Sequence, residues 1–200
     1  DDVVLRFLRM CRPMDRIRVI EMRDPKDAGI HGTVVTGEHC ADDLVWSAIH
    51  EVKRGGKVWF ACEGSDKTLA VGQMLRKNTG KKVMVINADN KLDAEQKAFL
   101  ADPDGMSHEY DAVVVSPAIS SGISVEHRDK PHFTAGFALF SGGAIRPADA
   151  AQMLRRVRYM KEWTIGLTSL NRFGGCRAED LLDGREAATQ TEDLFTQRTV

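Results

Sequence analysis

The sequence lacks the motifs by which many α/β proteins hold a nucleotide. Neither GxxxxGK[ST] nor GxGxxG occurs in its 200 residues; both motifs use glycine to bring backbone amides close to phosphate. The Gly80-Lys81 pair has no spaced glycine before it and precedes a strand-like segment rather than following one. We therefore expect that this chain by itself does not hold ATP phosphates and Mg²⁺ tightly.

Cysteines are few and far apart, at Cys11, Cys40, Cys62 and Cys176. No CxxC spacing is present, so a zinc knuckle or a thioredoxin-like site is not expected. Reduced thiols and a cytoplasmic or comparable compartment are the interpretation that fits isolated cysteines. No apolar run approaches the roughly 20 residues of a membrane-spanning helix, so no membrane partner is expected.

No charge of one sign dominates, because the formal net charge is -1 at pH 7 with 28% charged residues. Composition therefore does not by itself indicate a nucleic acid, a membrane or an acidic partner. Aromatic residues are only 6%, whereas 42% are hydrophobic, which excludes a disordered or collagen-like chain. This length suits one domain, or one domain with appendages, that buries its core without disulfides or metals.

Short apolar runs alternate with amphipathic segments along most of the chain. We predict strands at Arg16–Glu21, Gly32–Thr36, Lys57–Cys62, Val83–Ile86, Ala112–Val115, His132–Phe140 and Trp163–Leu167. We predict helices at Asp42–Lys53, Asp66–Lys77 (capped by Ser65), Ala94–Leu100 and Pro147–Tyr159, with a turn at Asp102–Gly105. Continuous apolar strands between helices predict a parallel sheet covered on both faces. Functional residues are then expected beyond the carboxyl ends of the strands, in loops 62–66, 87–92, 116–126 and 141–147.

Two segments carry residues suited to phosphate chemistry. Ser116–Val125 (SPAISSGISV) offers four hydroxyls and no charge, which fits an anion-binding nest or an ordinary serine-rich turn. Gln152–Arg158 (QMLRRVR) lies in the predicted Pro147–Tyr159 helix and holds the densest basic cluster, which fits a phosphate contact or a solvated arginine face. Trp59, Phe60 and Phe137 lie within strands and are predicted to be core residues, and no metal site is expected at His127 and His132.

Taken in order, three segments resemble motifs of superfamily 2 helicases. VWFACEGSDKTLAVGQML resembles motif IV, SPAISSGISV resembles motif V and QMLRRVR resembles motif VI. The sequence is most similar to helicases of the herpesvirus origin-binding protein kind and to related plasmid and phage replication proteins, over roughly residues 55–160. This resemblance implies a RecA-like three-layer α/β sandwich with a mainly parallel central sheet and helices on both faces.

The resemblance assigns expected roles at the ATPase site. Arg156 matches the arginine finger of motif VI, Gln152 matches its first polar position, and Arg158 stands near the second arginine of the motif. Gly122 matches the motif V glycine beside the nucleotide cleft, and Ser124 stands where many relatives carry Asp. Arg155 replaces the usual glycine of motif VI.

Contacts to the nucleic-acid backbone are expected from Ser65 and Lys67 in motif IV and from Ser116 and Ser121 in motif V. Contacts of this kind bind with little sequence preference and weaken as salt rises. The implied function is the second motor domain of an ATP-dependent DNA helicase or translocase of the origin-binding or primase–helicase type, acting in replication on single-stranded DNA.

The implied first RecA-like domain of the same polypeptide would hold most of the ATP and Mg²⁺. We accordingly expect residues 1–12 to be the end of a preceding domain or a linker helix, 13–170 the second RecA-like domain and 171–200 a C-terminal extension. The isolated chain is expected to be inactive as an ATPase.

Two other interpretations stay open. A non-catalytic nucleic-acid-binding or protein-interaction module on the same fold would also lack a P-loop. A phosphoribosyltransferase would likewise have a hydrophobic strand followed by a hydroxyl-rich loop, but Ser116-Pro117 stands where its paired acids would be.

Overall fold

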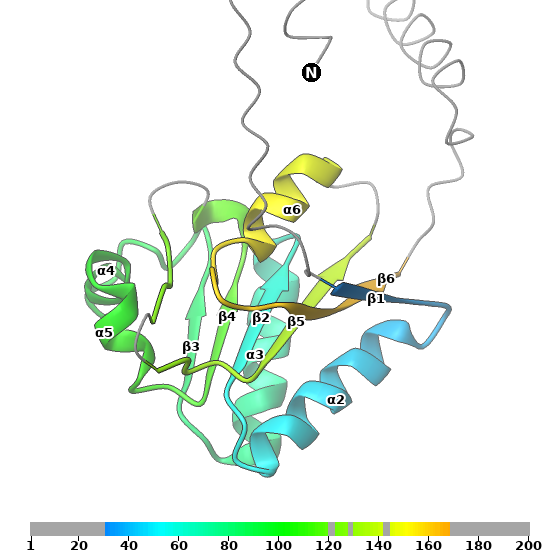
Figure 1. Ribbon diagram of the computed structural model, residues 1–200, viewed down its shortest axis with the longest axis horizontal. Coiled ribbons are helices and arrows are strands. Elements are labelled where there is room, and N and C mark those ends of the chain that lie inside the picture. The colour runs from blue at the N-terminus through cyan, green and yellow to red at the C-terminus, as the bar shows by residue number, and fades with distance from the viewer. Residues whose placement is uncertain (1–30, 120–122, 128–129, 142–144, 169–200) are drawn as a thin grey trace, which may run out of the picture.

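The computed structural model describes residues 31–119, 123–127, 130–141 and 145–168. These residues form a six-stranded sheet in the order β1-β6-β5-β2-β4-β3, in which every pair of neighbours is parallel (Figure 1). The strands are β1 His31–Thr36, β2 Val58–Cys62, β3 Val83–Ile86, β4 Ala112–Val115, β5 Ala135–Phe140 and β6 Glu162–Leu167.

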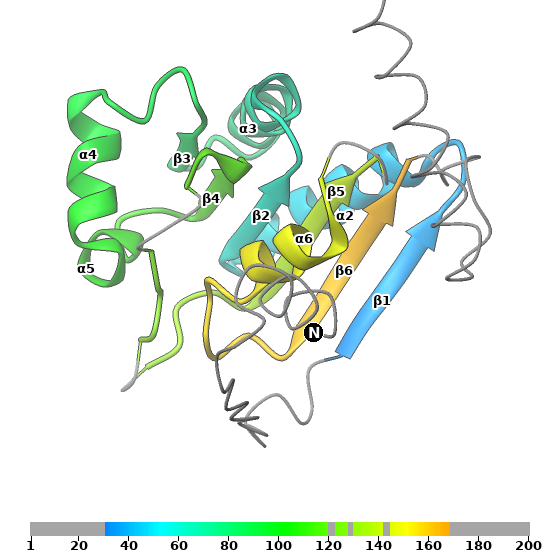
Figure 2. The same ribbon diagram turned by 90° about the horizontal axis from the view of Figure 1, so that it is seen from above.

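Helices cover both faces of this sheet, as Figure 2 shows. The helices are α2 Cys40–Lys53, α3 Ser65–Thr79, α4 Ala94–Ala101, α5 Pro103–Ser107 and α6 Pro147–Leu154, with a 3-10 turn, η2, at Pro117–Ile119. Side chains of α2 and α3 share one core cluster with one face of the sheet, and those of α4 and α6 share a second cluster with the opposite face. The predicted three-layer α/β sandwich, with a parallel central sheet and helices on both faces, is therefore confirmed, and it is consistent with a RecA-like fold.

The central strands are apolar on both faces because both faces are buried. All five residues of β2 are buried, and its side chains alternate between the two clusters: Trp59 packs with α4 and α6, and Phe60 with α2 and α3. Trp59, Phe60 and Phe137 are 0%, 0% and 6% exposed, which confirms them as core residues. The edge strand β1 (HGTVVT) is mostly exposed, and this includes Val34 at 55%.

Three local predictions were wrong. The residues predicted as a turn at Asp102–Gly105 instead begin the short helix α5, where the Asp102 side chain accepts the Gly105 amide. Ser65 is the first residue of α3 rather than its cap, because Gly64 holds that position. α6 ends at Leu154 and not near Tyr159. The predicted strand Arg16–Glu21 lies outside the described residues, as do the segments 1–12 and 171–200.

At β2 the connections that follow the strands switch from one face of the sheet to the other. β2 continues into α3 on one face, whereas its neighbours β4 and β5 continue into segments that pack on the opposite face. Such a switch point opens a crevice beyond the carboxyl ends of the strands, where open α/β sheets bind ligands. The loops that follow β2, β4 and β5 are those that carry the predicted functional residues.

Candidate functional site

The loop after α6 lies against the segment that follows β4. Val125 and Val157 form an isolated parallel bridge. The Val125 amide donates to the Arg156 carbonyl at 2.7 Å, and the Arg158 amide donates to the Val125 carbonyl at 2.9 Å. The two segments that resemble motifs V and VI, which are about 30 residues apart in sequence, are therefore in direct backbone contact.

This contact explains why α6 stops early. The Arg156 amide bonds back only three residues, to the Met153 carbonyl at 3.3 Å, and the next backbone groups turn to Val125 instead of continuing the helix. Arg156 consequently lies on the irregular segment 155–161, here called the Arg156 loop, and not within the helix that the sequence predicted. Gln152 stays on α6 and is exposed, so Gln152 and Arg156 do not share a face.

The side chain of Arg156 is largely buried, at 9% exposed. Its Nη1 donates to the Ile123 carbonyl at 3.0 Å. Burial, with a further contribution from the charge of Arg158, lowers the pKa of the guanidinium. The bond to the Ile123 carbonyl therefore orients the guanidinium of Arg156 relative to segment 123–127.

The other arginine of the cluster is at the surface. Arg158 is exposed, and its Nε donates to the hydroxyl of Ser124 at 3.1 Å. Ser124 and Arg158 thus form a second link between the two segments. Gly122 and Ser121 lie outside the described residues.

Ser116 occupies the position directly after β4, but its hydroxyl is used locally. The residue is 2% exposed, and its Oγ accepts the Ala118 amide at 3.2 Å, which begins the η2 turn. In this arrangement the hydroxyl does not reach the surface. Its predicted contact with nucleic acid stays a prediction.

At the carboxyl end of β2, a buried carboxylate that sequence reasoning missed joins two loops. The Glu63 side chain is 7% exposed and pairs with Lys67 one helical turn away. Its Oε2 also accepts the amide of Ser141 at 2.5 Å and the Ser141 hydroxyl at 2.6 Å. Ser141 follows β5, so Glu63 spans the crevice at the switch point.

The charge of Glu63 is stabilised by these donors. Burial would raise the pKa of the carboxyl, but the hydrogen bonds from Lys67 and Ser141 outweigh it and hold the pKa below its usual value. The charge of this carboxylate is paired with Lys67, so a phosphate bound at this loop would have to compete with Glu63 for Lys67. The loop also carries no glycine-rich phosphate-binding motif. Ser65 is half-buried beside this loop.

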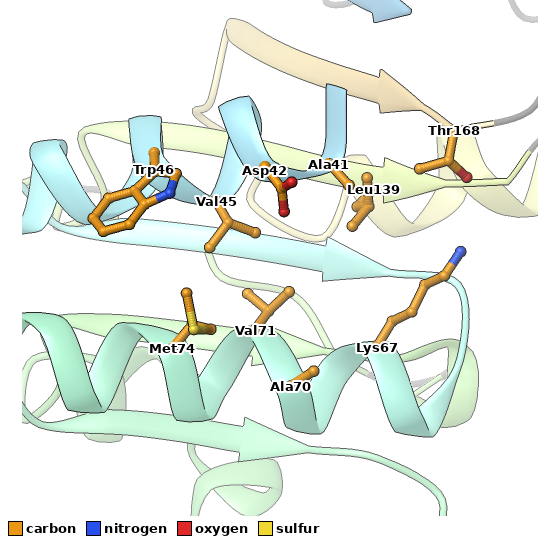
Figure 3. A pocket seen from close by; sticks show the side chains of 10 residues that line it. All are labelled: Ala41, Asp42, Val45, Trp46, Lys67, Ala70, Val71, Met74, Leu139 and Thr168. Carbon is orange, nitrogen blue, oxygen red and sulfur yellow. The ribbon is translucent and has the colours of Figure 1, made fainter. Parts of the chain in front are cut away.

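A groove on the opposite face from α6 lies between α2 and α3. It encloses about 400 Å³ and is lined mainly by apolar side chains, with Asp42 and Lys67 among its polar residues. Figure 3 shows Val45 of α2 and Val71 of α3 facing each other across it. Because the Arg156 loop packs on the other face of the sheet, the groove is separate from the predicted ATPase residues.

Within the described residues, no cluster of three or more His, Cys, Asp or Glu side chains is arranged to hold a metal ion. No helix in the same part of the chain is long and apolar enough to cross a membrane.

Matches to known proteins come from solved structures. No protein family matches the sequence, and neither does any curated protein. Among solved structures, the C-terminal domain of a possible DNA helicase from Lactobacillus plantarum is similar, with a TM-score of 0.40 and 16% identity over 70% of this chain and 76% of that one. This likeness concerns the fold alone.

Proposed function

We propose that the chain is the second motor domain of an ATP-dependent DNA helicase or translocase, with Arg156 as its arginine finger. The observation that carries this proposal is the contact between segments 123–127 and 156–158, which resemble motifs V and VI. A motor needs its finger and its cleft-facing segment to move as one unit. The bond from Arg156 to the Ile123 carbonyl supports such coupling.

The chemistry assigned to Arg156 is electrostatic. A guanidinium that reaches the transferring phosphoryl group from across a domain cleft stabilises its charge, and such fingers contribute about 10³–10⁵ in rate. Gln152 and Arg158 would border the same phosphates, and Gly122 and Ser124 would line the nucleotide side of the cleft. ATP and Mg²⁺ would be held mainly by a first RecA-like domain of the same polypeptide, so we expect this chain alone to hydrolyse ATP at the background rate.

The proposed nucleic-acid partner is single-stranded DNA, contacted through Ser65, Lys67 and Ser121. A contact through Ser116 would require its buried hydroxyl to leave the Ala118 amide and reach the surface. Lys67 is paired with Glu63, so binding of a phosphate would have to compete with that pair. In a fluorescence anisotropy titration over a salt series, Lys67→Ala should reduce the slope of log affinity against log salt by about one.

The ATPase test uses the chain expressed with its natural upstream sequence. We expect Arg156→Lys, which keeps the charge but loses the planar guanidinium, to lower DNA-stimulated turnover by about 10³ or more while ATP binding is kept. Arg54→Ala is the matched control, because Arg54 directly follows α2 and has a 76% exposed side chain. Urea unfolding of each variant separates loss of chemistry from loss of fold.

A non-catalytic nucleic-acid-binding or protein-interaction module is the second candidate. The burial of Arg156 favours it, since an arginine bonded to a neighbouring carbonyl can also be purely structural. Turnover that is absent, or that survives Arg156→Lys unchanged, would support this module and contradict the motor.

A further inference from the structure

Three histidine rings from separate segments gather beside the loop that carries Arg156. The ring centroid of His108 lies 4.6 Å from that of His127 and 4.9 Å from that of His132, and the last two are 5.8 Å apart. The ring of Tyr159, which belongs to the loop between α6 and β6, lies 5.6 Å from His127. These residues tie the end of α5, segment 123–127, the approach to β5 and the Arg156 loop together.

The hydrogen bonds assign the protons of this cluster. Nε2 of His127 lies 3.0 Å from the Asp104 carbonyl oxygen, which can only accept, so Nε2 carries a hydrogen. Nδ1 of His127 lies 3.0 Å from the Tyr159 hydroxyl oxygen. That oxygen already accepts the amides of His132 at 3.1 Å and Phe133 at 2.8 Å. Both of its lone pairs are in use, so the hydroxyl proton must point to Nδ1.

The two bonds together give a neutral His127 ring: the Asp104 carbonyl requires a hydrogen on Nε2, and the Tyr159 hydroxyl requires a bare Nδ1. A protonated ring would carry a second hydrogen on Nδ1, directed at an oxygen with no lone pair left. Protonation would therefore cost the free energy of a buried hydrogen-bond donor without an acceptor, because His127 is only 7% exposed. His127 also has a φ of 33°, a backbone conformation that side-chain-bearing residues keep only when their surroundings hold them.

We propose that His127 and Tyr159 form a proton-sensitive latch between segment 123–127 and the Arg156 loop. With His127 neutral, the Tyr159 hydroxyl donates to Nδ1 and the latch is closed. When Nδ1 takes up a proton, that bond is lost, and what still holds the loop is its backbone contacts to Val125, the arginine bonds and the amides of His132 and Phe133 on the Tyr159 oxygen. The inference rests on the proposed function for one point alone, that release of the loop would move an arginine finger.

Several charged or titratable groups face His127 and decide how it responds to acid. The Asp104 carboxylate, 4.0 Å from Nε2, favours a protonated ring, but it is about half exposed and also accepts the Glu126 amide. His108 and His132 oppose a second positive charge beside them. Burial raises the pKa of Tyr159, so its hydroxyl keeps the proton that it donates.

His132 acts in the same direction as the latch. Burial lowers its pKa, and the nearby His108, His127 and Lys57 lower it further, against the bond from its Nε2 to the Tyr110 carbonyl. A histidine whose folded pKa is depressed contributes stability that is present above its unfolded value, about 6.5, and is lost as pH falls. Loss of the latch in acid would add to this loss of stability at His132, and the two are examined together by comparing pH 7.5 with pH 5.0.

The first test observes the proton directly, on the full chain and without any activity assay. In long-range ¹H–¹⁵N spectra of the uniformly labelled protein, His127 should show a bare Nδ1 and a protonated Nε2 at pH 7.5. Single His→Asn variants assign the six histidine signals. A hydrogen on Nδ1 at pH 7.5, or an unchanged neutral ring down to the acid unfolding point, would overturn the latch.

The second test is a double-mutant cycle of His127→Asn and Tyr159→Phe, with asparagine chosen because it tolerates a positive φ. The coupling is read as the change in the unfolding equilibrium constant beyond the product of the two single effects. We expect about fivefold at pH 7.5, the size of one net hydrogen bond, and close to onefold at pH 5.0.

Tyr110→Phe is the matched control for this cycle. It also removes a tyrosine hydroxyl bond, the one to Glu95, but has no direct bond to His127. Paired with His127→Asn, it should show no pH-dependent coupling. Equal coupling of His127 and Tyr159 at both pH values would refute the latch, and if a variant fails to fold, the spectra of the wild-type protein decide. If the coupling depends on pH as expected but the longer polypeptide shows no ATPase activity, the latch is supported and the proposed motor function is contradicted.

Discussion

Replacement of the buried carboxylate Glu63 by the isosteric amide is the sharpest test of how the crevice at the switch point is held. In Glu63→Gln the amide oxygen can still accept from Ser141, but the amide nitrogen cannot accept from Lys67 and the charge is lost. Hydrogen bonds to charged groups contribute about 1.5–3 kcal/mol each. Because the side chain is 7% exposed, little of this is screened. We expect the free energy of unfolding to fall by about 2 kcal/mol.

The assay is urea unfolding at pH 7, monitored by fluorescence and circular dichroism to check for a single transition. Glu109→Gln is the matched control, because Glu109 is 53% exposed and pairs at the surface with Lys82. Exposed pairs of this kind contribute less than about 1 kcal/mol. Equal effects of the two variants would refute the argument that Glu63 ties the two loops together.

The same residue predicts a pH dependence whose sign follows from its pKa. The folded pKa of Glu63 lies below its ordinary value of 4.5. Its contribution is therefore fully present above about pH 4.5 and is lost as pH falls through the folded pKa. The difference in unfolding free energy between wild type and Glu63→Gln should shrink as pH falls through this range. A difference that stays constant with pH would contradict a stabilising role for the ionised Glu63 carboxylate.

Three further outcomes follow from the packing. Gly136→Ala should destabilise the fold by about 1–3 kcal/mol in urea unfolding, because the new Cβ would lie 2.6 Å from the Trp163 ring; a neutral effect would mean that the ring can shift. Iodide should quench Trp46, which is 45% exposed, and leave Trp59 and Trp163 at 0% and 4% protected; quenching unchanged by Trp46→Phe would contradict this. Arg158→Ala should change the unfolding free energy by less than about 0.5 kcal/mol, since its bond to Ser124 is at the surface; a larger loss would make that bond structural.

Local pattern was enough to predict the sheet and most of its helices. The strands Val83–Ile86 and Ala112–Val115 lie where the apolar runs placed them, because strands buried on both faces must be continuously apolar. α4 likewise begins at Ala94, where the sequence predicted a helix to begin. The end of α6 could not be predicted, since the groups that stop it belong to Val125, far earlier in the chain.

The sequence likewise predicted some features of the candidate site and missed others. The loops that follow β2, β4 and β5 were recognised from their place after apolar strands, and the arginine cluster from its composition. Glu63 was passed over, because nothing near it in sequence suggests that its partner is Ser141, 78 positions away. His127 and His132 were considered only as possible metal ligands, whereas their partners are Tyr159, Tyr110 and backbone groups.

The amino-acid sequence by itself determined the alternation of apolar strands and amphipathic helices, and with it a parallel sheet covered on both faces. Hydrophobic periodicity is a local property, so it can be read without coordinates. Tertiary structure alone decided where the Arg156 loop lies, which carboxylate spans the crevice and which nitrogen of His127 holds the proton. Each of these depends on hydrogen-bond partners supplied by distant segments, and only the folded chain brings those partners within 3 Å or so of one another.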